Sequence, residues 1–238
     1  MTEERRSDSG GADNGVGSID NRHLLLVGAG PGLGLAVARR FTEGGYRVTM
    51  VARSSDGLDI LVDSLADTGA DIGTLLADVG DSEGFGARIA ELYANDGAPG
   101  VIVYNAVMGA PDQLMSSTPA HLMTAYAVDV IGAIVVAQSA APAMRAAGSG
   151  TMVFTSGGFA DHPVSALATV SLGKAALRSA ATMLEADLRA DGIRVAALTI
   201  GGQIVAGTAF DPANIANRYW EVVHSDLPWQ AEYRFTGE

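Results

Sequence analysis

The chain has 238 residues, a formal net charge of −12 and no cysteine. This length suits one large domain with a substantial core, and the lack of cysteine excludes disulfide scaffolds, thiolate-bound zinc and thiol catalysis. The acidic balance argues against a nucleic-acid or anionic-membrane partner, because phosphates attract clustered Lys and Arg. Of the 15 basic side chains, Lys174 is the only lysine.

The N-terminal segment, residues 1–20, is polar and lacks hydrophobic periodicity, so we expect a disordered tail followed by a single domain over residues 21–238. The four histidines show no metal-ligand spacing, and no metal site is expected. No apolar run of 18 residues and no signal-peptide core are visible, which predicts a cytoplasmic protein without a membrane partner.

Strand and helix patterns alternate from His23 onward. Strands are expected at residues 24–27, 47–52, 72–77, 100–104, 151–155 and 193–200, with an edge strand at 230–235. Helices are expected at residues 33–44, 56–67, 81–95, 119–147, 164–190 and 212–224. This alternation predicts an α/β fold, a Rossmann-type doubly wound parallel sheet of about seven strands in a single domain.

A glycine-rich segment lies between the first strand and the first helix. It contains Gly28, Gly30, Gly32 and Gly34, with Leu33 opening the helix. Glycine permits a tight turn, lets backbone N–H groups approach a pyrophosphate, and lets the helix pack close to the sheet. The positive N-terminal end of the helix then faces the phosphates, so the segment predicts a dinucleotide site.

The second strand ends at Arg53, where a carboxylate would favour NAD by bonding the ribose 2′-hydroxyl. A guanidinium can instead pair with a 2′-phosphate, so NADP(H) is favoured over NAD(H). Arg53 as a solvated loop charge is the alternative, and the nearby Asp56 leaves the preference open.

Several motifs together resemble the short-chain dehydrogenase/reductase family. The glycine segment resembles its GxxxGxG loop, Asp78-Val79 its Asp-Val pair, and Asn105-Ala106 the start of its Asn-Ala-Gly motif. Thr155-Ser156 falls at its strand-end serines, and Gly173-Lys174 resembles its helix segment after the active-site Tyr. The resemblance implies that Asp78 caps the adenine and that Lys174 bonds the nicotinamide ribose.

Two catalytic positions depart from that pattern. The YxxxK motif requires Tyr at position 170, where the chain has Val170, and the helix Asn of the family is replaced by Asp129. Reduction of a ketone needs a proton for the developing alkoxide, and general acid catalysis is typically worth about 10²–10⁴-fold. We therefore expect ordinary ketone reduction to be impaired.

The remaining catalytic candidates are Ser156, Lys174, Asp129 and His162. Ser156 could bond a substrate oxygen or cap a strand end, and Asp129 could face the pocket or bond local backbone. His162, in the loop after the fifth strand, could titrate near neutral pH or be solvated. Because iminium reduction needs no proton for an oxyanion, carboxylates such as Asp129 and Asp161 could instead stabilise a substrate cation.

Three functions fit this sequence. The first is an NADP(H)-dependent oxidoreductase with a non-Tyr mechanism, acting on a small-molecule imine, iminium ion or activated double bond. The second is a non-redox enzyme such as a cyclase, dehydratase or isomerase, and the third is a non-catalytic nucleotide-binding protein. The Ala-rich helices at 119–147 and 164–190 suggest a homodimer or homotetramer, although the same pattern would serve intramolecular packing.

Overall fold

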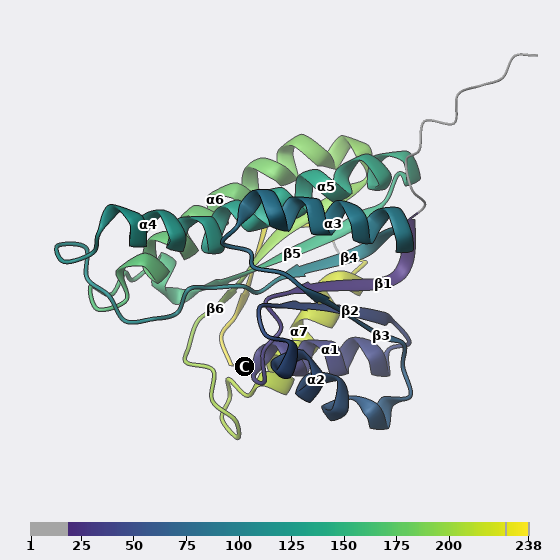
Figure 1. Cartoon of the computed structure of the whole chain (residues 1–238), viewed down its shortest axis with the longest axis horizontal. Helices are drawn as coiled ribbons and strands as arrows, with labels where there is room; N and C mark the ends of the chain where they lie inside the picture. The colour runs from purple at the N-terminus through teal and green to yellow at the C-terminus, as the bar shows by residue number, and fades with distance from the viewer. Residues whose placement is uncertain (1–18, 227, 238) are drawn as a thin grey trace, which may run out of the picture.

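A single parallel sheet forms the centre of the computed structural model, which describes residues 19–226 and 228–237 (Figure 1). Its strands are β1 (Ile19–Val27), β2 (Arg47–Ala52), β3 (Ile72–Leu76), β4 (Ala98–Tyr104), β5 (Gly150–Gly157), β6 (Ile193–Ile200) and β7 (Glu232–Phe235). The spatial order is β3-β2-β1-β4-β5-β6-β7, and every neighbouring pair is parallel. The predicted α/β, doubly wound parallel sheet in one domain is confirmed.

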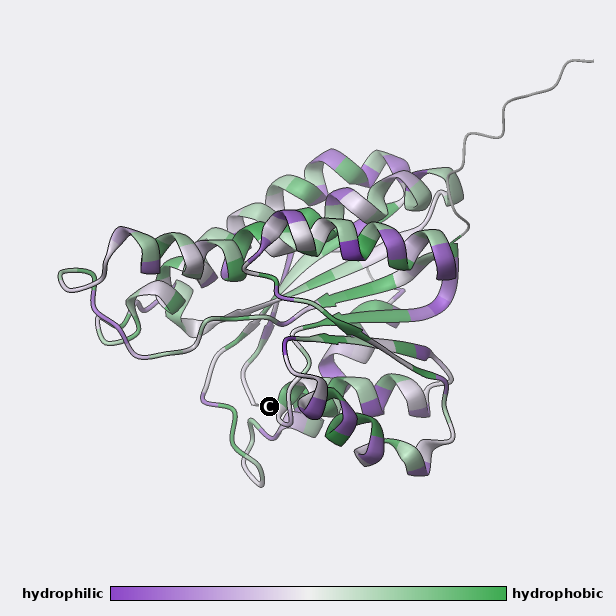
Figure 2. Ribbon diagram, in the orientation of Figure 1, coloured by the Kyte–Doolittle hydropathy of each residue, from purple (hydrophilic) through white to green (hydrophobic). Residues whose placement is uncertain are grey.

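Helices cover both faces of the sheet. They are α1 (Leu33–Glu43), α2 (Ser55–Ser64), α3 (Ser82–Asp96), α4 (Pro119–Tyr126), α5 (Gly132–Ala147), α6 (Ala168–Leu188) and α7 (Pro212–His224). Figure 1 shows α1, α2 and α7 on one face and α3, α5 and α6 on the other. The helical layers bury both faces, which explains why the strands are almost continuously apolar (Figure 2).

The run from Leu24 to Val27 illustrates this packing. Leu24 and Leu26 belong to the core under α1, α2 and α7, whereas Leu25 and Val27 belong to the core under α3, α5 and α6. All four side chains are fully buried, because successive residues of a strand point to opposite faces. Each such burial contributes about 1.5–3 kcal/mol of hydrophobic free energy.

Several element boundaries differ from the prediction, and three of the differences change how a segment is interpreted. Ile19 and Asp20 belong to β1, so the expected tail boundary at residue 20 is wrong by two residues, while residues 1–18 lie outside the described part. The helix predicted over 119–147 is interrupted by a π-helical turn, η2 (Ala127–Ile131). The last long helix begins at Ala168 rather than at residue 164, because the preceding loop carries its own turn.

The helical run Pro119–Ala147 meets the length and hydropathy that a membrane-spanning helix requires, contrary to the expectation that no such run exists. Its 18-residue apolar window is 44% buried within the domain. Core helices of soluble proteins have the same composition, so length and hydropathy by themselves are weak support for a membrane span.

The site is positioned by the order of the strands. Successive strands proceed outward in opposite directions from β1 and β4, which are hydrogen-bonded neighbours. In open α/β sheets ligands bind at the carboxyl ends of the strands beside such a switch point, where the loops diverge. The residues after β1, β2, β4 and β5 therefore surround the expected ligand site.

Candidate active site

The turn after β1 is locked against the end of β4. Gly28 has φ of +83°, and a Cβ at this position would lie 2.3 Å from the backbone nitrogen of Ala106. The N–H groups of Gly28 and Ala29 both donate to the Val51 carbonyl at 3.0 Å, and Asn105 Nδ2 donates to the Gly28 carbonyl at 3.0 Å. Only glycine fits here, because the turn needs both a positive φ and close backbone approach.

The rest of the glycine segment leaves open space before α1. A Cβ at Gly30 or Gly32 would meet no atom within 4 Å, whereas one at Gly34 would lie 3.0 Å from Ala29 Cα. Gly32 caps α1 without a side-chain hydrogen bond, and Leu33 is buried beneath the turn. The first N–H groups of the helix therefore face a space that can take an anion.

A cavity of about 270 Å³ adjoins this turn and is lined by Gly28, Ala52, Arg53, Val79, Asn105 and Ala106. Arg53 is exposed, and within the described part of the chain no carboxylate forms an ion pair with it. Asp56 lies on α2 away from this lining, where it accepts a hydrogen bond from Ser55 Oγ at 3.4 Å. The cavity thus presents one free guanidinium at its rim.

Asp78 occupies the turn after β3. Its side chain is exposed, and Oδ1 accepts a hydrogen bond from the Gly80 N–H at 2.9 Å. Its neighbours Ala77 and Val79 line the cavity, but Asp78 itself is outside the lining. Asp78 therefore shapes the turn at the cavity edge.

Lys174 and Ser156 come together where β5 meets α6. Lys174 Nζ donates to the Thr155 carbonyl at 2.7 Å, and Ser156 Oγ donates to the Lys174 carbonyl at 3.3 Å. Burial lowers the pKa of Lys174 to about 8, while the negative charge of Asp129 opposes that decrease. The pKa of this amine is therefore closer to 7 than that of an ordinary lysine, which makes its ammonium form a better proton donor near neutral pH.

Asp129 lies on η2 and faces α6. Its side chain is buried, and Oδ1 accepts a hydrogen bond from the Met108 N–H at 2.7 Å. Oδ2 is buried and has no hydrogen-bond partner among the residues that the structure describes. A Cβ on Gly173 would lie 2.6 Å from Oδ2, so the carboxyl packs directly on the glycine of α6. Burial raises the pKa of Asp129, and the Met108 N–H and Lys174 oppose the rise.

Asp161 and His162 do not join this group. Asp161 forms ion pairs with Arg178 at 2.5 Å and Arg234 at 2.7 Å, and these hydrogen bonds, that of Arg234 foremost, hold its pKa far below the usual value. Contrary to the expectation that Asp161 could stabilise a substrate cation, its carboxylate is already neutralised by these two arginines. His162 is exposed, and its backbone N–H bonds the Gly158 carbonyl.

A further acidic side chain, missed in the sequence, fixes the start of α6. Asp112 Oδ1 accepts the Thr169 N–H at 3.1 Å, and Oδ2 lies 2.9 Å from His121 Nε2. Hydrogen bonding from Thr169 and then from the His121 ring holds the pKa of Asp112 at about 2. Because Asp112 is far from α6 in sequence, no local pattern announces this contact.

The profile of the family described as short chain dehydrogenase matches residues 22–211. The chain belongs to the short-chain dehydrogenase family. Members of this family are oxidoreductases that bind a nicotinamide cofactor and act on small molecules. The glycine turn and its cavity lie inside the matched segment.

Known proteins similar to this short-chain dehydrogenase include oxidoreductase asL5 of Sarocladium schorii, 25% identical over 182 residues that cover 76% of this chain and 72% of that protein. A second is 3-dehydrosphinganine reductase TSC10A of Arabidopsis thaliana, 31% identical over 129 residues, 54% of this chain but 38% of the plant protein. A solved metagenomic short-chain oxidoreductase in complex with NADP has a TM-score of 0.82 and 25% identity, covering 92% of this chain and 99% of that one. A short-chain dehydrogenase from Streptomyces avermitilis has a TM-score of 0.80 and 23% identity, covering 91% and 89%.

Val170 lies on α6 one turn before Lys174 and is buried. Two buried tyrosines approach this edge of the sheet, but both hydroxyls are engaged elsewhere. Tyr104 donates to the Val128 carbonyl, and Tyr219 shares a 2.6 Å hydrogen bond with Thr155 Oγ1. Burial raises the pKa of both phenols, so neither is an acid suited to neutral pH.

Proposed function

We propose that this short-chain dehydrogenase is an NADP(H)-dependent reductase that works without a tyrosine donor on C=N bonds or activated C=C bonds. The observation that carries the proposal is that the fold combines a complete glycine turn with a partly buried Lys174 and a buried Asp129, while Val170 lies one helical turn before the lysine. A chain that had abandoned its cofactor would have no need to keep the space before α1 free of side chains.

The residues present fit a nicotinamide dinucleotide. The N–H groups at the start of α1 would hold the pyrophosphate in front of Gly30 and Gly32, where no side chain intrudes. The cavity beside Val79 and Ala106 is lined largely by small and apolar groups and would take the adenine. Lys174 would bond the nicotinamide ribose, and the bound cofactor supplies a hydride.

The preference for NADP(H) depends on Arg53. Its guanidinium is exposed at the cavity rim without a carboxylate partner among the described side chains, while Asp56 points elsewhere. A free guanidinium can make a bidentate pair with a 2′-phosphate, which NAD lacks. The solved relative in complex with NADP is consistent with this preference.

The preference for C=N or activated C=C bonds follows from the missing phenol. Reduction of an iminium ion consumes a positive charge and yields a neutral amine, so no alkoxide has to be protonated. The Asp129 carboxyl, buried with Oδ2 unpartnered, would stabilise such a cation strongly in its low-dielectric surroundings. A ketone would require a donor placed at its developing alkoxide, where Val170 carries none, whereas an imine nitrogen is basic enough to take up a proton before the hydride arrives.

Cofactor binding is the first experiment. Thermal shift and fluorescence titrations with NADPH and NADH are expected to show tighter binding of NADPH, with about 2.7 kcal/mol of stabilisation at a hundredfold excess over Kd. Failure of both cofactors to bind would sink the proposal. NADPH-dependent turnover of cyclic imines is the second readout, and binding without turnover of any imine or enone would favour a nucleotide-binding protein.

We further propose that the chain assembles as a homodimer or homotetramer through the outer surface of α6. Leu172 and Met183 on this helix are 54% and 61% exposed. Covering such side chains would gain hydrophobic free energy. Analytical ultracentrifugation is expected to find a dimer or tetramer, and Leu172→Glu with Met183→Glu is expected to give a monomer; a wild-type monomer at micromolar concentration would contradict assembly.

A further inference from the structure

Lys174 and Asp129 are an unusual pair of charged side chains. Asp129 is buried and Lys174 is partly buried, yet no ion pair within 4 Å joins either of them to any described residue, each other included. Lys174 Nζ donates one of its three hydrogens to the Thr155 carbonyl. Asp129 Oδ2 is buried and has no hydrogen-bond partner among the described residues. An ammonium group and a carboxyl group are thus held near each other with unused hydrogen-bonding capacity.

Few other charged groups act on Lys174 and Asp129. Asp112 is the other carboxylate that acts on Asp129, and it is already satisfied by His121 and by the Thr169 N–H. The charge of Asp129 also contributes to the raised pKa of Tyr104 on β4, but the Tyr104 hydroxyl donates to the Val128 carbonyl. Lys174 is the one cation that acts appreciably on Asp129, and Asp129 is the one charge that acts appreciably on Lys174, among the residues described.

Burial brings the pKa values of Asp129 and Lys174 closer together. It raises the pKa of Asp129 and lowers the pKa of Lys174 to about 8. A donor whose pKa lies near the working pH transfers a proton most effectively. Lys174 Nζ donates only to the Thr155 carbonyl among the described residues, so its other N–H groups are available to donate a proton as well as to bind a ribose.

We propose that Lys174 is the proton donor of this enzyme and that Asp129 is the positioning residue that maintains the lysine in its charged form. This inference rests on the proposed reductase function. Val170, one turn earlier on the same helix, carries no donor, so the lysine beside it takes the part that a phenol would play.

With an imine, the Nζ–H bond of Lys174 would break and an N–H bond would form on the imine nitrogen, leaving a neutral lysine amine and an iminium ion. The negative charge of Asp129 would favour that cation, and the bound cofactor would supply the hydride that gives the neutral amine. Lys174 then recovers its proton from water, so one proton and one hydride are consumed per turnover.

The single lysine permits a direct test without any substrate. Protein grown with 13C- and 15N-labelled lysine shows one side-chain signal, which is followed by NMR from pH 6 to pH 11. We expect a titration midpoint near pH 8, well below the value of about 10.4 for an ordinary lysine. Asp129→Asn is expected to lower this midpoint by about one pH unit, because it removes the charge that favours the ammonium form.

The control is Asp161→Asn, which removes a carboxylate that is paired with Arg178 and Arg234 and should leave the midpoint unchanged. A wild-type midpoint near 10.4, or a midpoint that Asp129→Asn leaves in place, overturns the inference. The wild-type measurement stands alone if Asp129→Asn does not fold. If the wild type does not bind NADPH, the proposed function is overturned instead. A failed proposed function and a failed role for Lys174 are therefore distinguishable.

Catalysis supplies the second arm. With a cyclic imine and NADPH, kcat/KM is expected to fall above the lysine midpoint, and this alkaline limb should move with the NMR midpoint in Asp129→Asn. Lys174→Arg keeps a cation for the cofactor but cannot donate a proton near neutral pH. It should therefore lose at least tenfold in kcat at saturating NADPH; an unchanged kcat would contradict donation by Lys174.

Discussion

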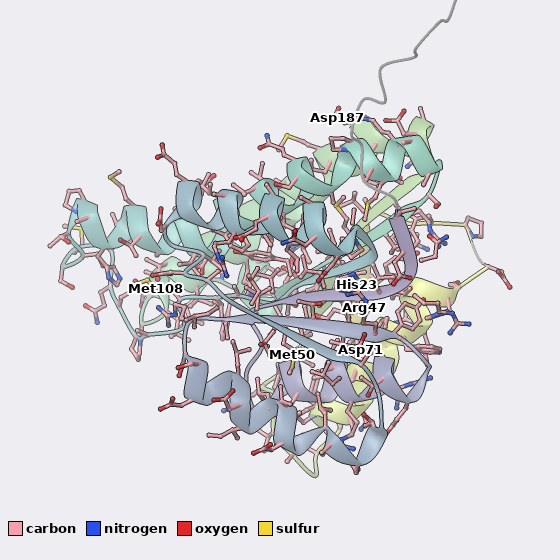
Figure 3. The ribbon with its side chains drawn as sticks, turned by 45° about the vertical axis from the view of Figure 1, so that its right-hand side comes forward. His23, Arg47, Met50, Asp71, Met108 and Asp187 are labelled. Atoms are coloured by element: carbon pink, nitrogen blue, oxygen red, sulfur yellow. The ribbon has the colours of Figure 1, made fainter. Side chains whose placement is uncertain are left out.

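Protonation of His23 should weaken the fold in mild acid. His23 on β1 is fully buried and pairs in register with Arg47 on β2, at the end of the sheet away from Met108 and the site (Figure 3). Arg47 donates to Nδ1 at 3.1 Å, and Nε2 lies 2.8 Å from Thr49 Oγ1. Because a guanidinium only donates, Nδ1 must be the acceptor of a neutral ring.

Burial lowers the pKa of His23 to about 4, and the positive charge of Arg47 adds to the decrease, against the opposing carboxylates of Asp20, Asp96 and Asp71. The unfolded chain, with a pKa near 6.5, binds this proton more readily. Stability from the neutral ring is therefore complete above about pH 6.5 and is lost as the pH falls toward 4. The loss reaches about 2 kcal/mol at pH 5 and about 3 kcal/mol below pH 4.

Urea unfolding followed by circular dichroism at pH 7, 6 and 5 measures this loss. His23→Gln should be less stable than the wild type at pH 7 but lose about 2 kcal/mol less between pH 7 and pH 5. The control His162→Gln, which alters an exposed ring, should keep the wild-type pH dependence. Equal losses in His23→Gln and the wild type would refute the argument that His23 is neutral because it is buried.

Three further predictions concern the site. Arg53→Ala should raise the Kd for NADPH about tenfold or more and leave that for NADH unchanged in titration, whereas Arg88→Ala on α3 changes neither; equal effects on both cofactors would argue against a 2′-phosphate contact. Gly28→Ala should lower the free energy of unfolding by about 2 kcal/mol or more, because the positive φ and the Ala106 backbone leave no room for a Cβ. Urea titration measures this loss, and an unchanged free energy of unfolding would show that the turn can shift to accommodate the Cβ. Val170→Tyr should give NADPH-dependent ketone reduction at least tenfold above the wild type. Overpacking at this buried position should lower the free energy of unfolding by about 1–3 kcal/mol. No gain of activity in a folded variant would mean that more than the phenol is missing.

The sequence predicted the architecture well for a clear reason. Alternation of apolar strand runs with helical patterns depends on local periodicity, and strands β2 and β6 and helix α7 have the bounds expected from it. The edge strand expected at residues 230–235 is also present, as Glu232–Phe235. Glycine spacing after β1 pointed to the turn because positive φ and close backbone approach restrict the residue type directly.

Contacts between distant segments could not be predicted in the same way. Nothing near Asp161 in sequence indicates that Arg178 and Arg234 neutralise it, and nothing near Asp112 indicates that it caps α6. The π-helical turn that carries Asp129 was likewise hidden in a uniform helical pattern. In each case the side chain's role depends on what the fold brings against it.

By itself, then, the sequence determined the parallel α/β sheet, the nucleotide turn and the positions of Lys174 and Val170, since each depends on residue type and spacing along the chain. Only the tertiary structure decided which charges are free. It paired Asp161 with arginine, left Arg53 without a carboxylate among the described residues, and buried Asp129 near Lys174 with one oxygen unpartnered. Proton affinity depends on burial and on neighbouring charges, and both arise only when separate elements pack together.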